Sequence, residues 1–210
     1  MDYPKINLFE AINSLRAVRN FDGKPVEKPI IKKILEAATK APTGSRREQW
    51  EFMVITDSNL KKEIAELYTI GFIEYLENHI EKEKISEENI EAQRQMVNNT
   101  PVLIFPCVNW NKTALTVQGN NSYIGKMTQY GSVFPALQNI LLASRGFGVG
   151  TTITTIGLAK QIKVKELLSV PEHVDLVAMI LMGYPKKKPL NMLRPPKRQN
   201  AELFTHWNSW

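Results

Sequence analysis

Cysteine, histidine and long apolar runs are all scarce in this sequence of 210 residues. Its one cysteine, Cys107, excludes an intrachain disulfide, and the apolar run around it favours a small buried side chain. The three histidines are far apart and lack the spacing of metal ligands, so we expect no metal site. No stretch approaches the roughly 20 apolar residues that span a bilayer, and no secretory-signal pattern opens the chain. We therefore expect a cytoplasmic protein without a membrane partner.

Positive charge is in excess but is unevenly spread. The formal net charge is +6, glutamates crowd residues 74–91, and residues 186–198 are basic without a single acid. A basic tail is one feature of nucleic-acid-binding proteins. This tail, however, has no aromatic residue on which a base could stack, and the chain has no nucleic-acid-binding motif. We therefore expect no nucleic acid, and an anionic cofactor or substrate as the partner of this charge.

Hydrophobic periodicity divides the chain into helices and a few strands. Asn7 followed by Glu10 is typical of a helix start, and apolar residues then recur at helical spacing. The mixed order of elements predicts a single α+β domain over residues 1–210, with a sheet of four or five strands flanked by helices. The sequence predicts helices over 7–18, 29–40, most of 58–98, 130–145 and 160–168, and strands over 52–56, 101–108, 151–156 and 174–182.

Two segments fit this domain poorly. The glutamate-rich part of residues 70–98 has weak apolar periodicity, so we expect an exposed helical excursion or lid there. The last segment, 185–210, is irregular and contains several prolines. An arm of that length with so little pattern would be unusual within a compact monomer. We therefore expect this arm to wrap around a second subunit.

Glycines and arginines are the candidates for binding a phosphate. Gly146, Gly148 and Gly150 follow a predicted helix and precede a strand, which is the reverse of a Rossmann phosphate turn. Arg16 and Arg19 are three residues apart at the end of the first predicted helix, so they would project from neighbouring positions and could bind an anion together. The alternative is a pair of solvated arginines that interact with the helix C-terminus.

Blocks of sequence along the whole chain resemble those of the FMN-dependent nitroreductase family. Residues 15–21 (LRAVRNF) are similar to its R-R-S-x-R-x-F signature, and residues 41–52 (APTGSRREQWEF) to its A-P-S-x-x-N-x-Q-P-W-x-F loop. Residues 138–150, 166–171, 182–185 and 197–207 resemble its later blocks in the same order. The resemblance implies a nitroreductase-like fold: a mostly antiparallel sheet flanked by helices, in a homodimer whose C-terminal arms are exchanged between subunits.

The same resemblance implies an FMN-dependent enzyme that passes electrons from NADH or NADPH to a small oxidised acceptor, such as a nitroaromatic or a quinone, by a ping-pong mechanism. Arg16 and Arg198, with the neighbouring Lys197, match the part of the family that holds the FMN phosphate. Arg19 matches a cation near flavin N1, where a fixed positive charge favours reduction. Other positions that match cofactor-contacting residues are Thr43, Gly44, Ser45, Arg46, Glu48, Thr151, Thr152 and Ile153, with Thr152 the candidate donor near flavin N5.

Departures from the family pattern leave the substrate open. Leu15 and Ala17 replace an arginine and a serine, whereas Arg46, Glu48 and Gln49 replace asparagine, glutamine and proline. Arg46 and Glu48 could instead pair with each other on the surface. The threonine-rich run and the glutamate before Gln-Trp also resemble the iodotyrosine deiodinase branch, in which a Glu-Tyr-Lys set in a lid grips an amino acid.

Glu74 and Tyr75, with Lys82 or Lys84, are the residues that could mimic that set. A solvated charged helix is the alternative interpretation of the same segment. Two other functions therefore stay open: a reductive dehalogenase-like enzyme, and a flavin-binding protein without turnover.

Overall fold

The computed structural model describes residues 6–79, 86–113, 119, 122–186 and 198–210. At its centre is an open sheet in which every pairing is antiparallel, with the order β1-β2-β5-β3 and with β4 also paired to β2. The predicted α+β architecture with a mostly antiparallel sheet is confirmed. The strands are β1 (Trp50–Ile55), β2 (Val102–Asn109), β3 (Gly150–Thr154), β4 (Val174–Leu176) and β5 (Met179–Gly183).

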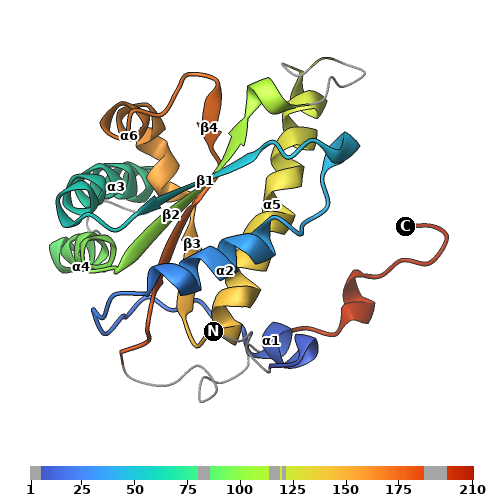
Figure 1. Ribbon diagram of the computed structural model, residues 1–210, viewed down its shortest axis with the longest axis horizontal. Coiled ribbons are helices and arrows are strands. Elements are labelled where there is room, and N and C mark those ends of the chain that lie inside the picture. The colour runs from blue at the N-terminus through green and yellow to red at the C-terminus, as the bar shows by residue number, and fades with distance from the viewer. Residues whose placement is uncertain (1–5, 80–85, 114–118, 120–121, 187–197) are drawn as a thin grey trace.

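Alternation along the central strand β2 explains why helices cover both faces of the sheet. Leu103 and Phe105 belong to the core on one face, whereas Val102 and Ile104 belong to the core on the other. Both faces of the sheet are therefore buried, so a ligand can bind only at the edges of the sheet and of the helices that cover it. The first face is covered by α3 (Ser58–His79), α4 (Glu87–Asn98) and α6 (Gln161–Leu167), and the second by α2 (Lys28–Ala38) and α5 (Tyr123–Gly146) (Figure 1).

The single strand predicted over 174–182 is wrong, because two strands replace it. The pairing of β4 with β2 stops at Leu176, and the pairing of β5 with β2 includes Ile180. Pro106 lies in β2 opposite the break and has no N–H to donate, so a regular ladder cannot run through it. The backbone N–H of Val177 donates instead to the Pro106 carbonyl oxygen, at 2.9 Å.

Helix α1 (Leu8–Ser14) begins where the sequence predicts but ends before residue 18. Its start is capped by Asn7, whose side chain accepts a hydrogen bond from the backbone N–H of Glu10 at 2.8 Å. At Leu15 the backbone becomes extended, and the N–H of Val18 donates to the carbonyl of Thr151 in β3 at 2.8 Å. Pairing with the edge of the sheet therefore overrides the helical pattern.

Helix α5 begins at Tyr123, earlier than the predicted residue 130. Its start is set by Ser122, whose hydroxyl accepts a hydrogen bond from the N–H of Gly125 at 3.0 Å. The helical prediction for 58–98 is confirmed as α3 and α4, and residues 80–85 between them lie outside the described ranges. The proposed lid role of this region stays a prediction.

Cys107 lies in β2 with 1% of its surface exposed, as predicted for a small buried side chain. Burial raises the pKa of its thiol to about 12, so the reactive thiolate is rare at neutral pH. We expect the native protein to resist a thiol-specific disulfide reagent at neutral pH and to react fully after unfolding in guanidinium chloride. The absorbance of the released thiolate measures both states, and rapid labelling of the native protein would contradict the buried position.

Large apolar side chains are exposed on α1, on α5 and on the end of the chain. Residues 198–210, which include the short helix η6 (Ala201–Phe204), extend away from the body of the molecule (Figure 1). Phe9 is 73% exposed and Trp207 is 82% exposed. A set of this size indicates a surface for another protein. The other exposed apolar residues of this set are Leu8, Ile12, Tyr123, Ile124, Met127, Phe134, Leu203, Phe204 and Trp210.

Among the described helices, none is both long and apolar enough to cross a membrane.

Candidate active site

Residues 15–22 are held against the open edge of β3. This segment forms a parallel bridge with Thr151, reinforced by the hydrogen bond from Val18. A Cβ atom on Gly150 would lie 2.8 Å from the Val18 side chain, so only glycine permits so close an approach. The backbone therefore fixes the positions of Arg16 and Arg19 on either side of Val18.

The sequence predicted that the two arginines project from one helix. This prediction is wrong, because α1 ends at Ser14 and both arginines lie beyond its end. In an extended segment, side chains three positions apart face opposite sides. Arg16 stays beside α1, where its guanidinium donates to the carbonyl of Asn13 at 3.1 Å. Arg19 instead lines a cleft on the surface. The two cations therefore meet different surroundings.

Arg16 has a second cation as a neighbour, Arg198 of the C-terminal arm. The pKa of Arg16 is lowered, first by burial and then by the positive charge of Arg198. Two guanidinium groups that repel each other form a favourable site for a dianion, which would remove the repulsion. The sequence assigned these two residues, from opposite ends of the chain, to one phosphate, and that assignment stays a prediction. Lys197, assigned with them, lies outside the described residues.

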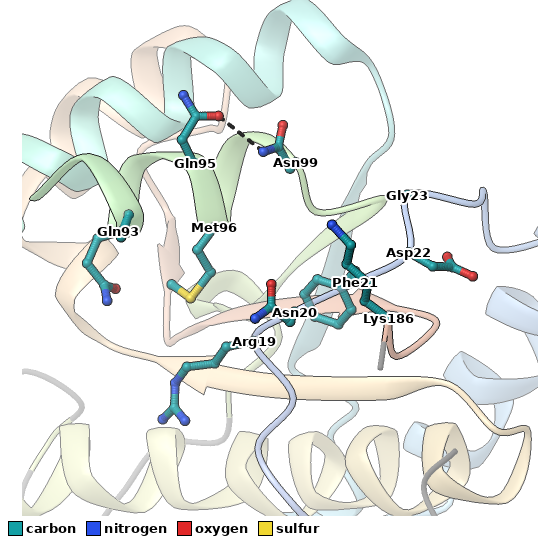
Figure 2. A pocket seen from close by; sticks show the side chains of 11 residues that line it. Arg19, Asn20, Phe21, Asp22, Gly23, Gln93, Gln95, Met96, Asn99 and Lys186 are labelled. Atoms are coloured by element: carbon teal, nitrogen blue, oxygen red, sulfur yellow. Dashed lines mark hydrogen bonds between the residues drawn. The ribbon is translucent and has the colours of Figure 1, made fainter. Parts of the chain in front are cut away.

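The cleft consists of two adjoining pockets. One, of about 510 Å³, lies between β3 and α3, and we call it the β3 pocket. The other, of about 660 Å³, lies between α4 and residues 19–23, and we call it the α4 pocket (Figure 2). Arg19, Gln93 and Met96 line both pockets and mark the boundary between them.

Aromatic rings and hydroxyl groups line the β3 pocket. The phenol of Tyr68 donates a hydrogen bond to Oε1 of Gln93 at 3.3 Å. Burial raises the pKa of Tyr68, opposed by a hydrogen bond with Thr154 and by the charge of Arg19, so the phenol stays a donor at neutral pH. This lining suits a flat ring with polar edges.

Among the described residues, no group of three His, Cys, Asp or Glu side chains lies close enough together to hold a metal ion.

The sequence identified part of this pocket. Thr152 and Ile153 line it together with Arg19, whereas Thr151 does not. Sequence reasoning missed the helical side of the pocket, since helical spacing shows which residues share a face but not which face meets β3. The missed residues on this side are Tyr68, Phe72, Gln93 and Met96, and on the strand side Thr154, Thr155 and Ile156; Tyr75 also lines the pocket and was considered only for a lid.

The predicted cofactor loop, 43–48, lies elsewhere in the molecule. Its residues Gly44–Arg46 form the short turn η1 near Ser132 of α5, with Ser45 and Arg46 at φ angles of 54° and 56°. None of residues 43–48 lines the β3 pocket or the α4 pocket. Within the described part of the chain, Arg46 and Glu48 form no ion pair with each other. Within a single chain, the loop 43–48 and the β3 pocket therefore lie apart, although the sequence assigned residues of both to one cofactor site.

A buried amide pair anchors this loop to α5. The hydroxyl of Thr43 donates to Oε1 of Gln49 at 2.8 Å, and Nε2 of Gln49 donates to Oε1 of Gln129 at 3.3 Å. Gln49 is 1% exposed and Gln129 is 3% exposed, so these amides need their partners. The glutamine that replaces the family's proline thus ties the loop to the helix that carries exposed apolar side chains.

Comparison with known proteins agrees with this geometry. The model of the nitroreductase family matches residues 12–184. The chain belongs to the nitroreductase family. A relative from Methanothermobacter thermautotrophicus, assigned as an NADH dehydrogenase/NAD(P)H nitroreductase, is 27% identical over 187 residues, which cover 88% of this chain and 81% of the relative.

Two further proteins are similar to this chain. Iodotyrosine deiodinase 1 of Rattus norvegicus is 25% identical over 182 residues, which are 85% of this chain but 62% of the deiodinase. The solved NADPH:FMN oxidoreductase from Vibrio harveyi, complexed with NAD+, has a TM-score of 0.73 at 19% identity and covers 96% of this chain and 77% of its own. That last likeness shows a shared fold.

Glu74 and Tyr75, the candidates for a lid that grips an amino acid, contact other residues in this protein. Glu74 forms an ion pair with Lys160 at the end of η4 (Ile156–Lys160). Tyr75 stacks on His79, with 4.4 Å between the ring centroids, while it also lines the β3 pocket. Lys82 and Lys84, which would complete the set, lie outside the described residues.

Proposed function

We propose that this protein binds FMN and transfers electrons from NADH or NADPH to a small oxidised acceptor such as a nitroaromatic or a quinone. The observation that carries the proposal is the β3 pocket, where Arg19 lies in one lining with the rings of Tyr68 and Phe72. The positive charge of Arg198, which acts on Arg16, adds a candidate site for an anion. Membership of the nitroreductase family and the relative assigned as an NAD(P)H nitroreductase support the same activity.

The residues present fit both ends of FMN. A phosphate monoester is close to dianionic at neutral pH, which matches the two positive charges of Arg16 and Arg198. The flavin ring is flat, with polar groups at one edge, which matches the aromatic and hydroxyl lining of the β3 pocket. Arg16 and Arg198 would hold the phosphate, Arg19 would lie at the polar edge of the ring, and Thr152 would offer a hydroxyl donor.

Bound FMN would supply the redox chemistry, taking hydride from the nicotinamide and passing the electrons to the acceptor in a ping-pong sequence. The protein contributes electrostatics and shape. Arg19 adds a positive charge at the pocket, which favours the more negative reduced state. Tyr68 and Phe72 of α3 keep water from one wall of the pocket.

A homodimer explains the exposed apolar surface and the separated loop. The helices α1 and α5 and the arm expose large apolar side chains that a second copy would cover. The loop 43–48 packs beside α5, so a dimer formed through α5 would carry this loop to the interface. In the proposed dimer, each FMN site combines Arg16 and Arg19 of one copy with the 43–48 loop of the other, and the arms are exchanged.

Removing residues 201–210 should shift the protein from dimer to monomer, because the deletion removes exposed Leu203, Phe204, Trp207 and Trp210. Light scattering after size exclusion should give twice the 23.9 kDa chain mass for the full protein and a lower mass for the truncation. As a control, Ile162→Ala changes an apolar side chain that is 70% exposed on α6, and it should leave the mass unchanged. A full chain that is monomeric would contradict the dimer.

Equilibrium dialysis against FMN and against riboflavin tests the proposed cofactor. FMN should bind more tightly, because riboflavin lacks the phosphate that Arg16 and Arg198 would hold. Equal binding of the two would remove the phosphate role, and no uptake of either would overturn the proposed function.

A reductive dehalogenase is the second candidate, favoured by the relatives named iodotyrosine deiodinase. The FMN-loaded protein would then bind a halotyrosine and release halide under reducing conditions. Absence of both binding and halide release eliminates this candidate and leaves the first one standing.

A further inference from the structure

The α4 pocket is the larger of the two pockets, yet none of the proposed FMN contacts except Arg19 lines it. It adjoins the β3 pocket at Arg19, Gln93 and Met96, and Figure 2 shows the last two side chains extending from α4 towards the segment that carries Arg19. A molecule that binds in the β3 pocket can therefore extend past Arg19 into the α4 pocket. The lining of the α4 pocket then selects which substituent such a molecule can carry.

This lining carries net positive charge. Arg19 and Lys186 contribute two cations against one carboxylate, Asp22. That carboxylate is already engaged by Lys24, whose ammonium lies 3.7 Å from Oδ2 and whose backbone N–H donates to Oδ1 at 2.9 Å. Figure 2 shows Asp22 pointing away from Arg19. Among the described residues, neither Arg19 nor Lys186 forms an ion pair of its own.

Hydrogen bonds hold the lining in place. The backbone N–H of Lys186 donates to the carbonyl of Asn20 at 3.0 Å, which fixes the segment on which Lys186 stands next to residues 19–23. The oxygen of the Gln93 amide accepts from Tyr68, so its N–H groups are left as donors at the boundary of the two pockets. A fixed backbone reduces the ordering cost of binding an anion, which then falls mainly on the exposed side chain of Lys186.

We propose that the α4 pocket binds a negatively charged group, a carboxylate or a phosphate, on the compound that exchanges electrons in the β3 pocket. This inference rests on the proposed function and adds a substrate class to it. The anion has two possible sources: an aromatic acceptor that carries a carboxylate, or the additional phosphate of NADPH. In either case Lys186 and the amide of Gln93 supply the donors that recognise it.

The variant Lys186→Gln tests this selectivity in the FMN-loaded protein. The ratio of KM for para-nitrobenzoate to KM for the neutral para-nitrobenzamide should rise about fivefold, the size of one charge-assisted contact in a half-open cleft. If the anion belongs to the donor, the ratio of KM for NADPH to KM for NADH rises instead. The control Lys163→Gln removes the same charge from an exposed side chain of α6 that lines neither pocket, and it should change neither ratio.

Titration of both nitro compounds into oxidised FMN-loaded protein, followed by flavin absorbance, makes the same comparison without turnover. The inference is overturned if Lys186→Gln leaves both ratios unchanged or if Lys163→Gln has the same effect. It is also overturned if Lys186→Gln weakens FMN binding as strongly, because the pocket would then serve the cofactor phosphate. A protein that takes up no FMN overturns the proposed function instead.

Discussion

Replacing Arg16 with alanine should raise the dissociation constant for FMN by about 10- to 100-fold. A hydrogen bond to a charged group contributes roughly 1.5–3 kcal/mol, and each 1.4 kcal/mol or so is a factor of ten in affinity. Burial and, after it, the positive charge of Arg198 lower the pKa of Arg16, so a phosphate held by both guanidinium groups would gain from both cations. Arg198→Ala should act in the same direction. Quenching of free FMN fluorescence on binding measures each constant.

Two controls separate a phosphate contact from a general effect of charge. Riboflavin should bind the Arg16→Ala variant as it binds the native protein, because it has no phosphate to lose. Arg94→Ala lowers the net charge equally, but Arg94 pairs with Glu66 and Glu91 on the surface of α3 and α4, so FMN affinity should be unaffected. Unchanged FMN affinity in Arg16→Ala would refute its phosphate role.

Adding one methyl group at Gly150 should weaken both the fold and the cofactor site. The new Cβ would meet three Val18 side-chain atoms at 2.8–2.9 Å, so residues 15–22 must move off the edge of β3. Overpacking of this kind costs about 1–3 kcal/mol of unfolding free energy. Because Arg16 and Arg19 stand on the displaced segment, FMN affinity should fall as well. Urea unfolding and FMN titration of Gly150→Ala measure the two effects.

Gly131→Ala is the matched control for this substitution. Gly131 is exposed inside α5, and an added Cβ meets nothing within 4 Å. Alanine is better than glycine inside a helix by about 0.8–1 kcal/mol, so this variant should be slightly more stable. Because Gly131 lies on the helix of the proposed dimer interface, the variant is a control for unfolding and not for FMN binding. If Gly150→Ala behaved like Gly131→Ala, the docking of residues 15–22 would not depend on that close approach.

Elements whose signals are local were predictable from the sequence. Asn7 and Glu10 mark the start of α1, and the apolar run in β2 marks a strand buried on both faces. Elements that depend on distant partners were not predictable. The end of α1 is set by Thr151 in β3, and the break between β4 and β5 lies opposite Pro106 in β2. In both places a contact between segments far apart in the chain decides the boundary.

The candidate site divides in the same way. The family resemblance pointed to Arg16 and Arg198, and the positive charge of Arg198 acts on Arg16 in the structure. It could not supply Gln93 or Met96, because helical spacing on α4 does not show that this face meets residues 19–23. The cofactor loop was assigned to the same site, yet the described residues of one chain keep it apart from both pockets. This separation is what the proposed homodimer accounts for.

Anaerobic mixing of FMN-loaded protein with NADH or NADPH tests the central claim most directly. The visible absorbance of bound flavin should bleach with at least one of the two donors, and a nitroaromatic or a quinone added afterwards should restore it. That order of events is what two separate half-reactions through one cofactor require. Bound FMN that stays oxidised with both donors would contradict an electron-transfer enzyme and would indicate a flavin-binding protein without turnover.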